Sequence, residues 1–222
     1  MHRSINRFVA FVLGVFAMLT AHAASPTPPD LHQAAARNDT AQIGQLLQAG
    51  AAIDARDAQG RTALLVATQN NRIAAAQALI EAGADVNAKD AIHDSPYLYA
   101  GARGHNEILK MTLAHGADLR STNRYGGTAL IPACERGHVE TVRMLIDAGV
   151  DVNHVNRLGW TGLMEAIVLS DGGPRHQQIV QMLIDAKANL NIPDRDGITP
   201  LNHARQRGQT AIVNMLAQAG AH

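Results

Sequence analysis

The sequence predicts an all-α repeat solenoid, an array of short helix pairs stacked side by side. Three observations predict it. An Asp or Asn followed three residues later by Gly recurs along the chain, mostly at a spacing of 33 residues, and such a fixed period is typical of stacked repeats. Apolar residues make up 46% of the chain and aromatic residues only 3%, which argues against aromatic-rich β-sandwiches and barrels. Within each period, apolar residues recur at helical spacing.

The charge and cysteine content exclude further classes of protein. The 222 residues include 19 basic and 19 acidic side chains, so the formal net charge is zero. Nucleic-acid binding leaves a basic footprint, and this chain has none, so we expect no nucleic-acid partner. Cys134 is the only cysteine. An intramolecular disulfide is therefore impossible, and we expect a small buried thiol.

Residues 1–23 have the pattern of a cleaved signal peptide. Two arginines precede an uncharged apolar run, and a small-x-small cleavage sequence ends at Ala23. The run of 13 residues would reach about 20 Å as a helix, against a hydrocarbon core of about 30 Å, so we expect no stable membrane insertion after cleavage. The mature chain would start with a Pro-rich leader at 24–29, which cannot begin a helix before Asp30.

The repeat period divides residues 30–222 into six units. A partial repeat comes first, four full repeats follow, and a truncated capping repeat ends the array. The expected boundaries are 30–56, 57–89, 90–122, 123–155, 156–193 and 194–222. The fourth full repeat has five extra residues, which we place within 168–174, between its two helices. Such an insertion is either a tolerated surface loop or a recognition loop, and the sequence leaves both open.

Each unit carries the same local signals in the same order. Asp or Asn at the first place and Gly at the fourth suit a type I turn at the tip of a hairpin, and His93 takes the place of the glycine in the second full repeat. A Thr or Ser then precedes the first helix and can cap it through its hydroxyl. Pro96 and Pro200 follow this residue at the first helical position, where the missing N–H is not needed. The capping residues are Thr62, Ser95, Thr128, Thr161 and Thr199.

The second helix of each unit has apolar residues in helical register, such as Val139, Val142 and Leu145. It is expected to end at a glycine suited to the left-handed conformation after a helix. Lys187 stands where the other repeats have this glycine. A left-handed residue with a Cβ costs roughly 1 kcal/mol.

Three segments resemble ankyrin-repeat motifs: Gly83–Ala88 (GADVNA), Gly137–Val142 (GHVETV) and Thr199–Ala204 (TPLNHA). The resemblance extends over residues 30–222. It implies stacked ankyrin helix-turn-helix units with β-hairpin fingers and a concave face that binds partners. The motif usually has His as the fourth residue of its T-P-L-H stretch, and here apolar packing must replace the polar network of that residue. The residues at this place are Leu65, Leu98, Ile131, Met164 and Asn202.

In ankyrin repeats, the finger tips and the ends of the first helices usually face the partner. At these positions, the third and fourth full repeats gather Trp, Tyr and Arg, the residue types that dominate binding hot spots. The predicted partner-binding residues are Arg124, Tyr125, Glu135, Arg136, Arg157, Leu158, Trp160 and Asp171. Trp160 could instead fold back against its neighbouring hairpin. We expect Tyr97 in the core and leave Tyr99 undecided.

No catalytic, cofactor or metal site is predicted. The sequence has no zinc-protease, Cys-x-x-Cys, Gly-x-Ser-x-Gly or P-loop pattern. His105, His138 and His176 recur at the start of second helices, a place where the resemblance implies a structural turn and capping role. In a stack they would lie about 10 Å apart, too far to share a zinc ion bound at about 2.1 Å. Glu165 and His154 could be drawn as an acid–base pair, but 11 histidines make such pairs common.

These observations lead to a monomeric, non-enzymatic protein-binding module of the bacterial periplasm. Its folded partner would bind the concave face, centred on residues 123–169. Resemblance to exported bacterial ankyrin proteins suggests an accessory factor for a periplasmic enzyme, for instance in peroxide defence, or an immunity-type inhibitor of a toxin or lipase. One alternative is a binder of small molecules or cell-wall fragments that uses Arg124, Arg157, Trp160 and Glu165. A hydrolase with an unrecognised site is the third hypothesis.

Overall fold

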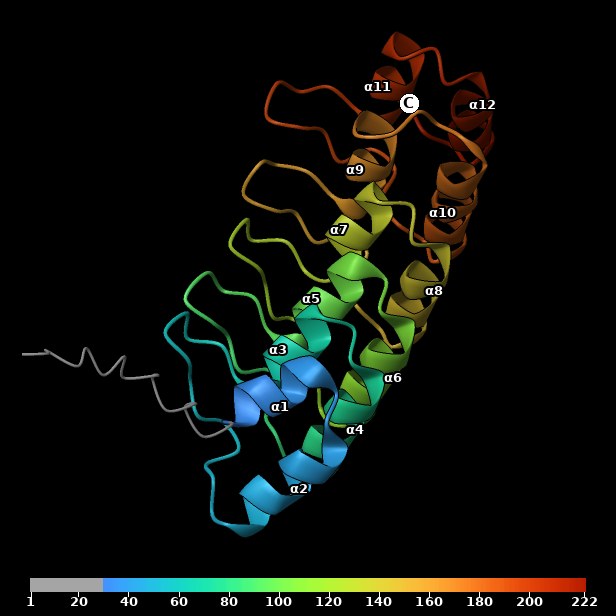
Figure 1. Ribbon diagram of the computed structural model, residues 1–222. Helices are drawn as coiled ribbons and strands as arrows, with labels where there is room; N and C mark the ends of the chain where they lie inside the picture. The colour runs from blue at the N-terminus through green and yellow to red at the C-terminus, as the bar shows by residue number, and fades with distance from the viewer. Residues whose placement is uncertain (1–29) are drawn as a thin grey trace, which may run out of the picture.

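The computed structural model describes residues 30–222, which form twelve helices in six consecutive pairs (Figure 1). The expected signal peptide and Pro-rich leader lie outside the described residues. The helices are α1 (Leu31–Arg37), α2 (Thr40–Gln48), α3 (Ala63–Gln69), α4 (Ile73–Glu81), α5 (Pro96–Arg103), α6 (Asn106–Ala114), α7 (Leu130–Glu135), α8 (Val139–Asp147), α9 (Gly162–Val168), α10 (Pro174–Asp185), α11 (Pro200–Gln206) and α12 (Thr210–Gln218). None of these helices is both long and apolar enough to cross a membrane.

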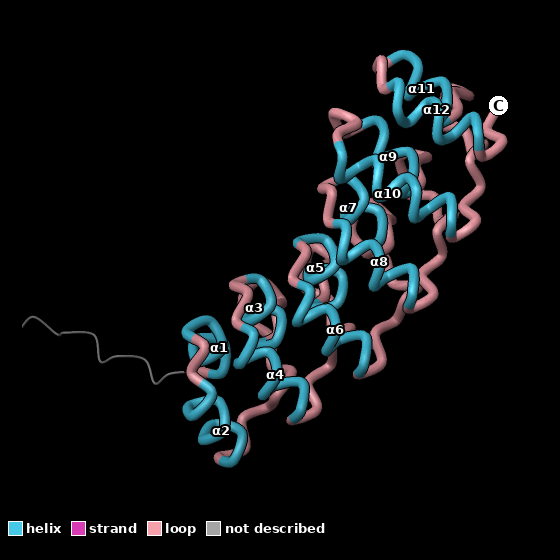
Figure 2. The backbone as a smooth tube through the Cα atoms, turned by 90° about the vertical axis from the view of Figure 1, so that its right-hand side faces the viewer, coloured by secondary structure: helices cyan, strands magenta, loops and turns pink. Residues whose placement is uncertain are grey.

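The helix pairs stack into two rows. The odd-numbered helices pack on one another in a first-helix row, and the even-numbered helices form a second-helix row beside it (Figures 1 and 2). Long loops project from the first-helix row on the side away from the second-helix row (Figure 1, left). The core lies between the rows and between successive pairs, so each unit depends on its neighbours for burial. The predicted helical solenoid is confirmed.

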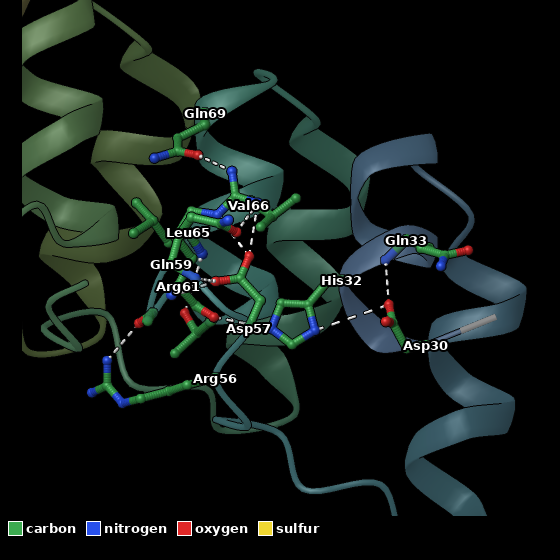
Figure 3. A network of polar contacts seen from close by, with 12 residues as sticks. Asp30, His32, Gln33, Arg56, Asp57, Gln59, Arg61, Leu65, Val66 and Gln69 are labelled. Atoms are coloured by element: carbon green, nitrogen blue, oxygen red, sulfur yellow. Dashed lines mark hydrogen bonds and ion pairs between the residues drawn. The ribbon is translucent and has the colours of Figure 1, made fainter. Parts of the chain in front are cut away.

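Five of the projecting loops end in a tight turn that we call a finger: 57–61, 90–94, 123–127, 156–160 and 194–198. The first residue of every finger is Asp or Asn, and its Oδ1 accepts hydrogen bonds from the backbone N–H groups two and four residues later. In the first finger, Asp57 Oδ1 accepts from Gln59 and Arg61, each at 2.9 Å (Figure 3). The residues 30–222 contain no β-strand, so the expected hairpins are reduced to their tips.

Helix starts follow the predicted capping chemistry at four of five sites. The hydroxyl oxygens of Thr62, Ser95, Thr161 and Thr199 accept from the backbone N–H three residues later. The prediction for Thr128 is wrong, because its buried Oγ1 has no hydrogen-bond partner among the described residues. Pro132 lacks the N–H that would bond to the Thr128 carbonyl, and Ile131 N–H donates to that carbonyl instead, at 3.3 Å. The helix α7 therefore begins late, at Leu130.

The sequence predicted that all five extra residues of the fourth full repeat lie between its two helices. The structure places only two of them there. The loop before α10 covers residues 169–173, two residues longer than the loop 70–72 before α4. The other three extra residues lengthen α10, which has 12 residues where α4 has 9. Pro174 supplies the favourable first helical position of this longer helix.

Two departures from the repeat pattern are visible in the backbone. Lys187 adopts the left-handed conformation with φ of 61°, at the place where Gly149 has φ of 91°. His93 takes the place of the finger glycine and is also left-handed, with φ of 66°. Both residues carry the strain of a Cβ in this region.

The core is apolar and continuous across the repeats. Leu65, Leu98, Ile131 and Met164, which replace the usual histidine, are all buried. Tyr97 is fully buried, as expected, but its hydroxyl has no partner within the described chain. Cys134 is a buried free thiol, in an apolar position that raises its pKa.

Candidate functional site

A hollow of about 340 Å³ lies where the three middle fingers meet the ends of α5, α7 and α9. These three first helices lie side by side in Figure 1. The walls are partly apolar, with Leu98, Ile131, Pro132, Leu158 and Leu169. The charged residues that line the hollow are Asp94, Arg103, Arg124, Glu135, Arg136 and Glu165. The hollow therefore combines apolar area with equal numbers of acidic and basic groups.

The three arginines are exposed residues, and each is engaged within the protein. The guanidinium carbon of Arg103 lies 5.4 Å from the centre of the Tyr99 ring, and that of Arg124 lies 5.3 Å from the centre of the Tyr125 ring. Arg124 Nη1 also lies 3.7 Å from Asp94 Oδ2. Arg136 Nη1 donates to the carbonyl of Ala102 at 2.6 Å. The positive charge thus lies at the rim of the hollow.

The carboxylates lie deeper than the arginines. Glu165 on α9 is only 6% exposed, and its Oε1 accepts from Asn156 Nδ2 at 2.8 Å. Asn156 is held in place because its Oδ1 accepts from the N–H groups of Leu158 and Trp160. Burial raises the pKa of Glu165 to about 7, and the like charge of Glu135 adds to this shift, while the Asn156 hydrogen bond and Arg136 oppose it.

The other two acidic residues differ in their pairing. Burial raises the pKa of Asp94, the charge of Arg124 opposes this shift, and the charge of Asp90 adds to it. Glu135 is half-buried at the end of α7. Among residues 30–222, neither Glu135 nor Glu165 forms an ion pair, whereas Asp94 faces Arg124.

An exposed apolar row runs along the three middle fingers. Ile92, Tyr125 and Leu158 occupy the third place of consecutive fingers and are 49%, 55% and 52% exposed. The same place holds exposed polar residues in the flanking fingers, Gln59 and Asp196. We call Ile92, Tyr125 and Leu158 the apolar row. It borders the hollow, which Tyr125 and Leu158 also line.

The structure brings five of the eight predicted partner-binding residues to the hollow: Arg124, Tyr125, Glu135, Arg136 and Leu158. The other three lie elsewhere. Arg157 Nη1 donates to the carbonyl of Arg124 at 3.0 Å and joins two fingers. Trp160 is half-buried at the base of its finger and does not line the hollow. Asp171 lies in the loop before α10, where it accepts from Gly173 N–H at 2.8 Å.

From the sequence, Glu165 was assigned a binding role only in the alternative of a small-molecule binder, and its pairing with Asn156 was missed. A signal for the pair exists, because the finger residue and the helix residue nine places later face each other. In the last repeat the same two places hold Asp194 and His203, which are 2.7 Å apart. Tyr99, left undecided from the sequence, lines the hollow under Arg103.

The suggested pair of Glu165 and His154 does not form. His154 Nε2 lies 2.7 Å from the carbonyl oxygen of Gly126, in a finger loop. Two of the recurring histidines, His105 and His176, bond to the preceding repeat, and the side chains of His105 and His138 do not cap their own helices. His105 Nδ1 lies 3.0 Å from Thr68 O, and His176 Nε2 lies 3.0 Å from Glu135 O. No group of three or more potential metal ligands occurs within the described part of the chain.

Comparisons with known proteins identify the family. The family model for ankyrin repeats in three copies matches residues 19–90 and 97–194, and the model for ankyrin repeats in many copies matches 173–217. The chain belongs to the ankyrin-repeat family. Ankyrin-repeat domains are generally non-enzymatic modules of protein–protein interaction. No curated protein matches the chain.

Solved structures of ankyrin-repeat proteins are similar over most of the chain. A domain from Acinetobacter baumannii AYE is 65% identical, with a TM-score of 0.85, and the match covers 86% of this chain and 98% of that one. The ankyrin-repeat protein EF0377 is 44% identical, with a TM-score of 0.82 and coverage of 85% and 96%. The ankyrin-repeat domain of Bcl-3, a member of the IkappaB family, is 25% identical, with a TM-score of 0.78 and coverage of 88% and 87%.

Proposed function

We propose that this ankyrin-repeat protein is a non-catalytic module that binds a folded protein partner on the concave side, between the fingers and the first-helix row. The observation that carries this proposal is the apolar row. Three large apolar side chains are about half exposed at the same place of three consecutive fingers, while the flanking fingers are polar there. Exposed apolar side chains that gather on one side of a protein mark interaction sites.

The fingers suit a binding role because they are rigid before any partner arrives. In each middle finger, the Oδ1 of Asp90, Asn123 or Asn156 accepts two backbone hydrogen bonds. Arg157 N–H also donates to the carbonyl of Tyr125 at 2.9 Å, and this bond joins two fingers. A preorganised surface loses little conformational entropy on binding. More of the free energy gained from apolar contact therefore contributes to the affinity.

We propose that the chain is exported and that its partner lies in the periplasm. Residues 1–23 support this proposal through their signal-peptide pattern. Two roles fit such a module: an accessory factor for a periplasmic enzyme, or an immunity-type inhibitor of a toxin or lipase. We further propose that the mature protein acts as a monomer and takes no cofactor or nucleic acid.

Affinity capture from periplasmic and cytoplasmic fractions of the source organism tests the proposal. The baits are the wild type and the double variant Tyr125→Ala/Leu158→Ala. A matched control is Ile73→Ala, which removes an apolar side chain that is 42% exposed at the start of α4, in the second-helix row. We expect a partner that the wild type and the control retain and the double variant loses. Equal recovery of every protein by all three baits would contradict the proposed surface.

A second candidate function is the binding of small molecules or cell-wall fragments, and two of its four predicted residues line the hollow. Arg124 and Glu165 line the hollow, as that hypothesis needs, but Arg157 and Trp160 do not. Ligand pockets typically have volumes of about 300–1,000 Å³, so the hollow is at the lower end for a ligand. Isothermal titration calorimetry, which measures the heat of binding as cell-wall fragments are added to the protein, tests this second function.

A further inference from the structure

We propose that the hollow receives one Lys or Arg side chain of the protein partner, which is held between the carboxylates of Glu135 and Glu165. This inference rests on the proposed function, because the partner that covers the apolar row also closes the hollow beside it. It names the chemistry of the partner at one defined point: a single basic side chain surrounded by apolar surface.

Charge is layered in the hollow, with the arginines at the rim and the carboxylates deeper. The arginines at the rim are exposed and already engaged, Arg103 by Tyr99, Arg124 by Tyr125 and Asp94, and Arg136 by a backbone carbonyl. The carboxylates of Glu135 and Glu165 have no ion pair within residues 30–222. Arg103 and Arg136 also lack an ion pair in this part of the chain, but they are exposed, whereas Glu135 is half-buried and Glu165 is buried. The negative charge therefore lies deeper in the hollow than the positive charge, and a cation complements it there.

The two carboxylates of Glu135 and Glu165 repel each other when both are ionised. The charge of Glu135 makes ionisation of Glu165 less favourable, in addition to the effect of burial. Of the two carboxylate oxygens of Glu165, only Oε1 accepts a hydrogen bond within the described chain. The other oxygen, Oε2, is therefore available to a ligand. A guanidinium or ammonium group between the two carboxylates would replace this repulsion with two attractions and supply the missing donors.

The size and lining of the hollow suit a long basic side chain. Ile131, Pro132, Leu98 and Leu169 supply apolar walls, which suit the methylene stem of Lys or Arg above a charged end. The volume of about 340 Å³ leaves room for one long side chain. The neighbouring fingers hold Tyr125 and Leu158, so a partner seated on the apolar row can reach the hollow directly.

The probe for this proposal is Nα-acetyl-arginine methylamide, with the isosteric but neutral citrulline compound as the chemical control. The carboxyl ¹³C signals of Glu135 and Glu165 are followed by NMR in the mature chain at a pH where both are ionised. We expect a saturable shift of both signals with the arginine compound and none with the citrulline compound. Glu165→Gln keeps the acceptor for Asn156 and should weaken binding about tenfold, the effect of losing one charge-assisted hydrogen bond.

Two further variants make the test specific. Glu135→Gln should weaken binding of the arginine compound to a similar extent. Glu140→Gln is the matched control, because this glutamate is exposed on α8 and pairs with Arg143 at 3.5 Å, outside the hollow. Circular dichroism of each variant verifies that the array is folded.

The absence of a saturable shift with the arginine compound would overturn the proposal, and so would an equal response to the citrulline compound. This failure is distinct from failure of the proposed function. The Tyr125→Ala/Leu158→Ala variant could lose its partner while the arginine compound does not bind the wild type. That result would refute the proposed basic side chain in the hollow and would support the proposed protein-binding surface.

Discussion

Replacing Gly101 by Ala should destabilise the protein, although the same change is expected to stabilise most helices. Gly101 lies inside α5, where Ala has a helix propensity about 1 kcal/mol better than Gly. A Cβ built at Gly101 would lie 2.8 Å from the Cβ of Ala129, at the start of α7. Neither Cβ can rotate away, so the two neighbouring first helices must separate.

The net effect follows from these two opposing terms. Overpacking of a tight core contact costs about 1–3 kcal/mol, and the gain in helix propensity offsets about 1 kcal/mol of this. We therefore expect a net loss of up to about 2 kcal/mol in the free energy of unfolding for Gly101→Ala. Gly44→Ala is the matched control, because Gly44 lies inside α2 and a Cβ there meets nothing within 4 Å. It should gain about 1 kcal/mol.

Urea unfolding followed by circular dichroism measures both variants. The urea midpoint should fall for Gly101→Ala and rise for Gly44→Ala, with unchanged slopes. If the two midpoints rose together, the close approach of α5 and α7 would not be a constraint, and the reasoning from the contact with Ala129 would be refuted.

Three other changes have expected outcomes that unfolding measurements check. Lys187→Gly should stabilise the protein by up to about 1 kcal/mol, since it removes a Cβ from a left-handed residue; a lower midpoint would show that the lysine side chain contributes more than the strain costs. Tyr97→Phe should stabilise by about 1 kcal/mol, because it removes a buried hydroxyl that has no partner within the described chain; a clear loss would reveal a hydrogen bond to that hydroxyl. Glu165 has a pKa of about 7 in the folded protein, against an ordinary value of 4.5. Between pH 4.5 and about pH 7, the folded protein therefore keeps a proton on Glu165 that the unfolded chain has lost. The wild type should therefore lose up to about 3 kcal/mol of stability as the pH rises through this window. Glu165→Gln should lack this loss, and parallel pH profiles for the two proteins would count against a buried, protonated Glu165.

Local structure could be predicted from the sequence because its causes are local. The Asp and Asn residues of the fingers, the capping Thr62 and the left-handed Gly149 act on backbone groups a few residues away. Thr128 shows the limit of this reasoning. Its hydroxyl has the same sequence context as the other caps, but Pro132 four residues later changes the first turn and removes the cap.

The candidate site could be predicted only in part, because it depends on residues that different repeats bring together. Arg124 and Glu135 were found from family positions and residue type, and both line the hollow. Trp160 was chosen for its residue type, but the structure places it outside the hollow. Glu165 was assigned a binding role only in the alternative of a small-molecule binder, and its burial could not be predicted, since it follows from the packing of α9 against α7 and α11.

The apolar row was accessible to sequence reasoning in principle. Its members share the third place of consecutive fingers, as the 33-residue period shows for Ile92, Tyr125 and Leu158. Only the structure shows that all three side chains are exposed at once and that they border a hollow.

Hydrogen–deuterium exchange of the protein with and without its captured partner tests the central claim most directly. We expect slower exchange in the fingers 90–94, 123–127 and 156–160 and at the ends of α5, α7 and α9 when the partner is bound. Exchange in α4, α6 and α8 of the second-helix row should remain unchanged. Protection confined to the second-helix row, with the three fingers unaffected, would contradict the account.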